Sequence, residues 1–286
     1  MSQSPIAADD AGLRSDVRRL GDLLGQTLVR QEGPELLALV EEVRKSVREG
    51  NGAEILAKLS VEDSVQLVRA FSTYFHLANV AEQVHRARVL ADARATGGSW
   101  LARAVDRIEV ALKAQTPGHE LSKEDIEQWV AAMSVRPVFT AHPTEAARRS
   151  VLNKLGSIAE LLDDPRNPSQ QDRLAETIDL LWQTDELRLG RPEPLDEALN
   201  ALYYLDDLFT QTVPEVLNDF AKEMKRIDVE VPITARPLSF GNWIGGDRDG
   251  NPNITAQVTT DAMVLQVGHA IRVTIAAMNE LRQMLS

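Results

Sequence analysis

Apolar side chains recur at three- and four-residue spacing through the first 130 residues, which is the pattern of amphipathic helices. From Leu13 to Arg30 the apolar positions fall on one helical face, and Gly33–Pro34 interrupts that stretch. Pro34 suits the first turn of a following helix, because its fixed φ fits there and its missing N–H would have no partner in any case. A longer stretch runs from Val61 to Arg94. We therefore predict a helical region over residues 13–130.

The last helix of this region has a predicted start at Ser122. Its hydroxyl can cap the first turn, and acidic Asp125 follows three residues later. Trp129 is expected on the apolar side of the same helix. We therefore predict a capped helix beginning just after Ser122.

Two short segments have a different character, because they are β-branched and aromatic between polar breakers. They are Val135–Thr140 and Pro232–Trp243, and we predict a strand in each. Long helices are expected between them, over residues 144–162, 171–189 and 195–225. The predicted fold class is therefore mainly α, with two short strands.

The final predicted helix, from Thr255 onward, is apolar around most of its circumference. Such a helix requires protein on most sides. It reaches Ser286 without a glycine or proline stop signal. We expect either that the chain is cut short or that another chain covers this surface. His269, on the same helix, is expected to be a packed and hydrogen-bonded histidine.

Composition narrows the function classes. The 286 residues are 43% hydrophobic and 26% charged, as in ordinary globular proteins, and the net charge of −12 disfavours binding to nucleic acid or anionic membranes. Cysteine is absent, which excludes disulfides and thiolate metal sites. The sequence contains no stretch of about 20 apolar residues, so no membrane-spanning helix is predicted. We expect a cytoplasmic protein whose residues 1–12 form a disordered tail.

The first candidate site is the segment Thr140–Arg149, where a predicted strand runs directly into a helix. His142 lies at the junction, and the following Thr144 can cap a helix whose free amides would bind an anion. Arg148 and Arg149 add positive charge about one turn further on. A histidine in this position is suited to carry a proton near neutral pH. The alternative is a structural histidine that closes the turn, with both arginines on the solvated helix surface or in salt bridges.

The second candidate site is the loop Gly245–Pro252, which again joins a predicted strand to a helix. Gly245, Gly246 and Gly250 permit backbone angles closed to other residues. Asp247, Arg248 and Asp249 crowd polar groups beside them. The alternative is a turn that hydrogen-bonds to itself, with Arg248 held between the two aspartates. A calcium-binding EF-hand is rejected, because the sixth and twelfth positions would be Pro252 and Val258.

Together these segments resemble the phosphoenolpyruvate carboxylase family. The resemblance covers most of the chain from about Leu13 and has four parts in the family's order. These parts are Phe75–Glu82, Thr140–Glu145, Leu181–Glu186 with Arg191–Pro192 and Asp196–Glu197, and Gly245–Pro252. It implies a cytoplasmic enzyme, usually a homotetramer, that is largely helical around an eight-stranded barrel. Here it implies a helical region over 13–130 and the first part of the barrel over 131–286, with two strands of an incomplete TIM-like barrel.

The same resemblance implies the reaction. The family combines phosphoenolpyruvate with bicarbonate to give oxaloacetate and phosphate, using Mg²⁺ or Mn²⁺. This is an anaplerotic carbon fixation that feeds the tricarboxylic acid cycle. His142 matches the family's catalytic histidine. Trp243 and the loop residues Gly245, Gly246, Asp247, Arg248 and Asp249 match a stretch near the substrate, and Arg148 is a further candidate for substrate binding.

The family's metal carboxylates, its catalytic lysine and its FHGRGG-type loop have no match in this chain. We therefore expect one wall of an active site, and an isolated chain without carboxylase activity. One alternative is a non-catalytic helical interaction protein that retains the family fold. Another is a small anion-processing hydrolase that uses His142, Asp247 and Asp249 with a metal.

Overall fold

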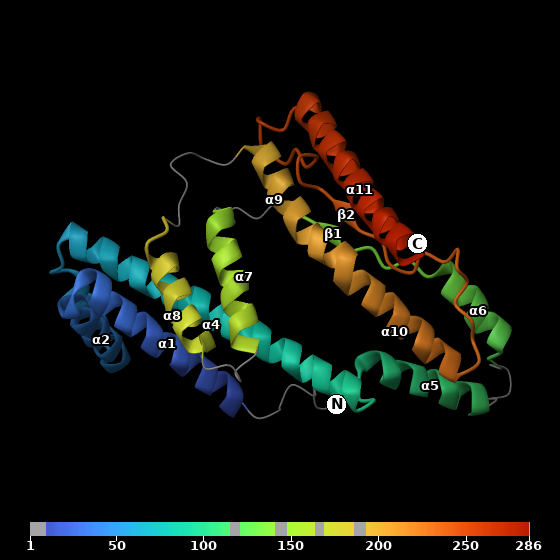
Figure 1. Cartoon of the computed structure of the whole chain (residues 1–286), viewed down its shortest axis with the longest axis horizontal. Coiled ribbons are helices and arrows are strands. Elements are labelled where there is room, and N and C mark those ends of the chain that lie inside the picture. The colour runs from blue at the N-terminus through green and yellow to red at the C-terminus, as the bar shows by residue number, and fades with distance from the viewer. Residues whose placement is uncertain (1–9, 115–120, 141–147, 164–168, 186–192, 286) are drawn as a thin grey trace. The chain divides into compact units, whose positions relative to one another are not determined.

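The computed structural model describes residues 10–114, 121–140, 148–163, 169–185 and 193–285. These residues are mainly helical and include two short parallel strands (Figure 1). The chain forms two compact units, and each combines two separate stretches of sequence. Unit 1 is Met1–Ala95 with Ala147–Arg188, and unit 2 is Thr96–Ala146 with Leu189–Ser286. The expected domain boundary near residue 130 concerns the family fold and stays a prediction.

Unit 1 is a bundle of helices around one hydrophobic core. Leu20 and Leu28 of one helix, Leu77 of a second, and Ile158 and Trp182 of two more are almost fully buried in this core. The helices of the unit are α1 (Ala11–Glu32), α2 (Pro34–Glu49), α3 (Gly52–Leu56), α4 (Val61–Ala95), α7 (Arg149–Asp163) and α8 (Ser169–Trp182). The predicted helices at 13–30 and 61–94 are confirmed, as is the start of a helix at Pro34.

A buried polar contact joins α1 to α8 inside this bundle. Thr27 is fully buried, and its hydroxyl donates to the carboxylate of Asp179 at 2.6 Å. Arg30 donates to the same oxygen at 2.8 Å. Burial would raise the pKa of Asp179, but the hydrogen bonds from Arg30 and Thr27 outweigh it and hold the pKa below its ordinary value. The buried threonine therefore has a satisfied hydroxyl, as the packing of α1 on α8 requires.

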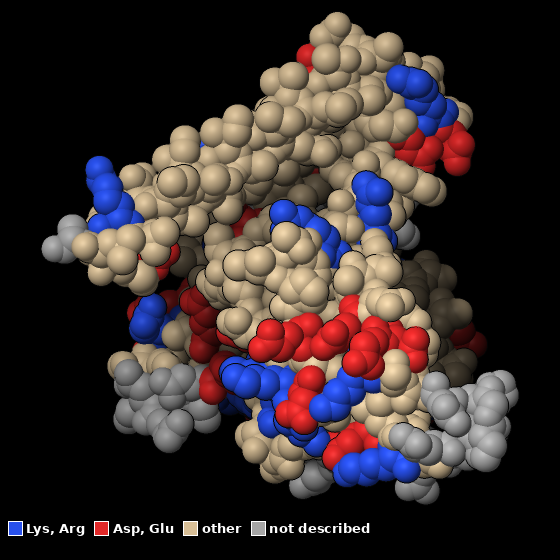
Figure 2. All heavy atoms as spheres, turned by 90° about the vertical axis from the view of Figure 1, so that its right-hand side faces the viewer, with Lys and Arg blue, Asp and Glu red and all other residues tan. Residues whose placement is uncertain are grey.

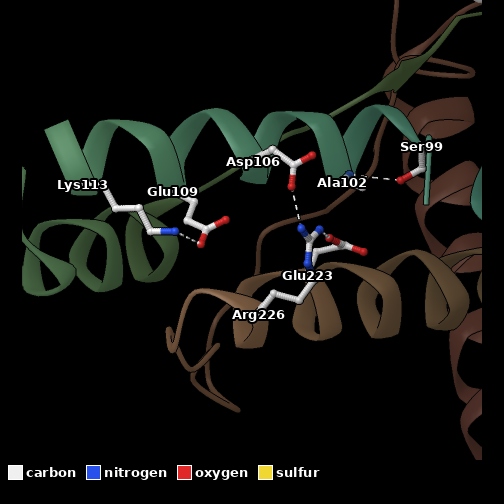
Figure 3. A network of polar contacts seen from close by, with 7 residues as sticks. All are labelled: Ser99, Ala102, Asp106, Glu109, Lys113, Glu223 and Arg226. Atoms are coloured by element: carbon white, nitrogen blue, oxygen red, sulfur yellow. Dashed lines mark hydrogen bonds and ion pairs between the residues drawn. The ribbon is translucent and has the colours of Figure 1, made fainter.

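Unit 2 contains the remaining helices and both strands. A core that includes Val105, Val130, Phe220 and Val229 holds three of its helices together. At the edge of that core Arg226 donates to Asp106 at 2.5 Å and also pairs with Glu223 (Figure 3). The helical elements are α5 (Trp100–Ala114), α6 (Lys123–Ala132), α9 (Pro194–Asp207), the π-helix η1 (Leu208–Thr212), α10 (Val213–Arg226) and α11 (Ala256–Leu285).

Helix α6 begins where the sequence predicts. The Ser122 hydroxyl accepts from the Asp125 N–H at 3.1 Å, and the Asp125 carboxylate accepts from the Ser122 N–H at 2.9 Å. This is a reciprocal capping box. The prediction for Trp129 is wrong, because its side chain is 61% exposed.

Other sequence predictions need correction at helix boundaries. The helix predicted over 171–189 ends at Trp182. The helix predicted over 195–225 is confirmed within one residue at each end, but it contains the π-helix η1 between α9 and α10. The helix predicted over 144–162 is observed from Arg149, and residues 141–147 lie outside the described part. Residues 1–9 of the predicted disordered tail lie outside the described part of the chain. Ala11 and Gly12, which were predicted to belong to the tail, are part of α1.

Candidate functional site

The two strands pair in parallel and bring distant parts of unit 2 together. Strand β1 (Val138–Phe139) lies beside β2 (Gly241–Asn242), with Val138 opposite Gly241 and Phe139 opposite Asn242. An isolated bridge between Val135 and Leu238 extends the pairing. Both predicted strands are thus confirmed, although each is short. Because parallel strands end at the same edge of a sheet, the segments after Phe139 and after Asn242 leave from one edge.

Trp243 anchors the loop that follows β2. Its N–H donates to the Phe139 carbonyl at 2.8 Å, which continues the strand pairing by one residue. Its own carbonyl accepts from the N–H groups of Gly246 and Asp247, both at 2.8 Å. The indole remains 56% exposed. The backbone of Trp243 is therefore fixed on both sides while its ring is open to a ligand.

Gly245 allows the loop to pack against α11. Its φ of +78° lies in the left-handed region, and a Cβ there would stand 2.7 Å from the Cβ of Ala262 on α11. Both the backbone angle and the close approach therefore require glycine at this position. Neighbouring Ile244 is 7% exposed and lies in a small core with Ala262. The loop is thus held against the first turns of α11.

The polar residues of the loop mostly bond locally. The Asp247 carboxylate accepts from the Asp249 N–H at 3.2 Å, and Asn251 Oδ1 accepts from the Asn253 N–H at 3.0 Å. The self-bonded turn considered for this sequence is therefore present. Arg248 is not held between two aspartates: its guanidinium donates to the Thr259 hydroxyl of α11 at 3.3 Å. Arg248 and Asp249 are exposed, so the loop presents charged groups of both signs to solvent.

The structure brings together Trp243, Gly245, Gly246, Asp247, Arg248 and Asp249, all predicted for substrate binding, in one loop. Arg148 belongs to unit 1. It lies just before α7 and not one turn inside a helix. Its guanidinium lies 3.8 Å from the Asp185 carboxylate. His142 lies outside the described residues, as do Thr144 and the predicted anion site at the helix start.

Two features of the site were not recognised from the sequence. Asn242 fixes the turn after β2, because its side-chain oxygen accepts from the Ile244 N–H at 2.9 Å. Ala262 provides the surface against which Gly245 packs. Asn242 could have been suspected as a strand-end residue that caps its own turn. Ala262 carried no signal, because its role depends on the packing of a helix against a loop.

Neither a three-residue metal-ligating group nor a membrane-spanning helix is found in the described part of the chain. Within the ranges given above, no group of three histidine, aspartate or glutamate side chains is arranged to hold a metal ion. Asp247 and Asp249 therefore do not form a metal centre with a third such ligand there. Among the described helices, none is long and apolar enough to span a membrane.

The geometry defines a class first: a mainly helical protein that presents a glycine- and aspartate-rich loop at the carboxyl edge of parallel strands, where ligands commonly bind. Comparison with known proteins then gives the family. Residues 13–286 match the family model for phosphoenolpyruvate carboxylase. The chain belongs to the phosphoenolpyruvate carboxylase family.

Individual relatives carry the same name. The chain is 36% identical over 275 residues to a phosphoenolpyruvate carboxylase of Pseudomonas aeruginosa, and 34% identical over 273 residues to one of Proteus mirabilis. A third, from a Thermus species, is 37% identical over 259 residues. These alignments cover 87–90% of this chain but only 30% of each relative. The chain thus spans about a third of the length of the curated relatives it matches.

Proposed function

We propose that this chain forms the N-terminal part of an enzyme that carboxylates phosphoenolpyruvate with bicarbonate, giving oxaloacetate and phosphate. The observation that carries this proposal is the family match over residues 13–286, shared with relatives named phosphoenolpyruvate carboxylase. In the cell this reaction would be an anaplerotic carbon fixation that supplies the tricarboxylic acid cycle. The finer assignments below are parts of the same proposal.

His142 is proposed as the proton carrier. It follows Phe139, the last residue of β1, by three positions in the sequence. The Trp243 N–H donates to the Phe139 carbonyl, so the second loop begins at that same strand end. The short sequence distance from Phe139 and the pairing of β1 with β2 therefore allow His142 to act beside the loop. Imidazole is the side chain whose ordinary pKa suits proton transfer near neutral pH.

The loop after β2 is proposed to bind the anionic reactants. Phosphoenolpyruvate, carboxyphosphate and the enolate are all anions, whereas the loop has one cation, Arg248, between Asp247 and Asp249. The hydrogen bond to Thr259 places Arg248 beside the first turn of α11, where the positive end of the helix dipole also favours an anion. The two aspartates require additional positive charge from elsewhere. Arg148 stays a proposed substrate-binding residue on the ground of the sequence alone.

The wider architecture is carried over from the family as a proposal. The pair β1–β2 would be the first two strands of an incomplete TIM-like barrel, since two strands cannot close a barrel. The ligands for Mg²⁺ or Mn²⁺ would lie outside this chain. A homotetramer in the cytoplasm is the proposed state of the complete enzyme.

Oxaloacetate formation from phosphoenolpyruvate, bicarbonate and Mg²⁺ provides the test. We expect no turnover from the 286 residues alone. A chimera that joins residues 1–286 to the remaining sequence of the Pseudomonas aeruginosa relative should be active. In that chimera His142→Asn should remove oxaloacetate formation while the thermal unfolding curve is unchanged. Full activity of the variant would exclude the proton role, and turnover by the chain alone would exclude the partial-site proposal.

A second candidate is a non-catalytic helical interaction protein, and one observation favours it. Helix α11 exposes large apolar side chains along its length, including Met263, Val267, Ile271 and Met278, each 53–65% exposed. Figure 2 shows this helix as a long band with few charged side chains. Surfaces of this kind usually meet another protein. This candidate would be favoured by two results together: the chimera folds but is inactive, and the 286-residue chain binds a partner protein through α11.

A further inference from the structure

The side of α11 that points away from α9 carries a continuous stripe of exposed apolar side chains. The opposite side packs on α9: Ala262 is almost fully buried there, and Nε2 of His269 lies 3.3 Å from the Asp206 carboxylate. His269 is thus packed as the sequence predicts, although its Nε2 makes no hydrogen bond within the described residues. Val264 follows Ala262 by two positions and therefore points about 200° away around the helix. Figure 2 shows α11 as a band with few charged side chains, and six large apolar residues along it are each more than half exposed: Val264, Val267, Ile271, Ile275, Met278 and Leu281.

The stripe has the spacing of a coiled-coil seam. Its residues recur every seven positions, with a second set three positions after the first, which are the a and d positions of a heptad repeat. The repeat is sustained over about three heptads, a length typical of a helix that pairs with another helix. The a positions are Val264, Ile271 and Met278, and the d positions are Val267, Thr274 and Leu281.

Thr274 is the one polar residue in this seam, and it can be buried without an unpaired donor. Its hydroxyl donates to the Ala270 carbonyl at 2.8 Å within the helix. Threonine in a helix often satisfies its hydroxyl in this way. The seam therefore carries no polar group that would oppose its burial against another helix.

Charged residues beside the seam indicate the direction of the partner helix. Asp261 and Arg282 both occupy the e position of their heptads, at opposite ends of the stripe. They are 21 positions apart, roughly 30 Å along the helix, so they cannot pair within one chain. In an antiparallel coiled coil, e positions face e positions. Asp261 of one copy would then meet Arg282 of a second copy, and two-fold symmetry would form this pair twice.

A parallel pair of the same helices would leave both charges without a partner. In a parallel coiled coil, e positions face g positions. The g positions opposite Asp261 and Arg282 would be Ala256 and Ala277, neither of which carries a charge. The charges beside the seam therefore favour the antiparallel direction.

The register that pairs the charges also matches the apolar positions. It sets the remaining g positions against one another, so that Met263 lies beside Met284 of the second copy and no charge is buried on that flank. Along the seam it sets large apolar residues of one copy against those of the other in every layer but the central one, where isoleucine meets threonine. The layers are Val264 with Leu281, Val267 with Met278, and Ile271 with Thr274.

We propose that a second copy of this chain covers the stripe of α11, in an antiparallel helix pair whose two-fold axis lies midway between Val264 and Leu281. The chain as a whole has a net charge of −12, but α11 contains two acidic and two basic residues and is itself neutral. The paired helices therefore do not repel each other. The proposal is independent of the carboxylase reaction, because it rests only on α11.

Sedimentation equilibrium of the 286-residue chain provides the first test. We expect a dimer at concentrations of about 10 μM and above. Ile271→Asp, at the centre of the seam, should give a monomer at the same concentration while circular dichroism stays unchanged, because Ile271 is exposed and contributes little to the core. A wild-type monomer at about 100 μM would overturn the proposal, and the stripe would then belong to a different protein segment.

Charge reversal tests the register. Asp261→Arg and Arg282→Asp should each weaken the dimer at least about tenfold, because each places like charges together at both ends. The double variant should recover most of the wild-type affinity. Glu280→Arg is the matched control, since it makes the same charge change as Asp261→Arg at a position away from the seam. Asp261 also accepts from the Gln257 amide at 2.9 Å, so Arg282→Asp decides if Asp261→Arg does not fold. Equal weakening by Glu280→Arg, or no recovery in a folded double variant, would refute the register.

Introduced thiols test the direction, because the chain has no cysteine of its own. A mixture of Met263→Cys and Met284→Cys chains should form a disulfide-linked heterodimer under mild oxidation. Each variant alone should not form one, because equal residues stand roughly 30 Å apart in the antiparallel pair. Disulfide-linked dimers of each single variant, without the mixed dimer, would overturn the antiparallel arrangement.

Discussion

Replacing Gly245 with alanine tests how the candidate loop is held against α11. The new Cβ would stand 2.7 Å from the Cβ of Ala262, and the backbone would keep a φ of +78°. A non-glycine residue in the left-handed region costs about 1–2 kcal/mol. Overpacking against the buried side chain of Ala262 costs about 1–3 kcal/mol more. We therefore expect Gly245→Ala to lower the free energy of unfolding by about 2–5 kcal/mol.

Gly250→Ala is the matched control, because its φ is +70° and a Cβ there meets no atom within 4 Å. It should cost only the backbone part, about 1–2 kcal/mol. Urea unfolding followed by circular dichroism and tryptophan fluorescence measures both variants, and coincident transitions would justify the free energies. Equal losses for the two variants would refute the close approach of Gly245 to α11.

Two further predictions concern helix ends and pH. Ser122→Ala should cost about 1 kcal/mol and speed amide exchange at Asp125, whose N–H donates to the Ser122 hydroxyl; unchanged exchange would contradict the capping role. Asp179→Asn should destabilise the chain modestly, by about 1 kcal/mol or less after solvent screening. The native pKa of Asp179 is lowered from its ordinary value of 3.8, so its contribution is present above that pH and lost as the pH falls through the native pKa. The variant's deficit in urea unfolding should therefore shrink in acid, and a constant deficit would contradict the pKa argument.

Local patterns in the sequence were sufficient for much of the secondary structure. The spacing of apolar residues located α1 and α4 within about two residues at each end, since a long helix must bury one face. Ser122 and Asp125 located the start of α6, because a capping box is made by neighbours in sequence. The helix predicted over 195–225 was also located within one residue at each end, although the spacing of apolar residues did not indicate the π-helix η1 inside it. A boundary was wrong for the helix predicted over 171–189, which ends at Trp182.

The candidate site also contains features that the sequence predicted and features that it did not. The sequence proposed Trp243 and the Gly245–Asp249 loop as candidates through the family resemblance, because glycine and aspartate are also common in purely structural turns. Their role in binding stays a prediction. It did not predict that Arg248 would bond to Thr259 or that Asn242 would orient the turn. Those contacts depend on where α11 lies relative to the loop. The role of His142 stays a prediction.

By itself, then, the sequence determined the helical character, the two strand positions and the family, all of which depend on local spacing or on motif order. Only the tertiary structure decided that β1 and β2 pair in parallel and that Gly245 must accommodate Ala262. It alone placed His269 of α11 3.3 Å from the carboxylate of Asp206 on α9. The two residues of each of these contacts are separated by 17 to 103 positions in the chain. Contacts across such separations follow from how apolar faces pack, and packing is a property of the whole unit and not of any local pattern.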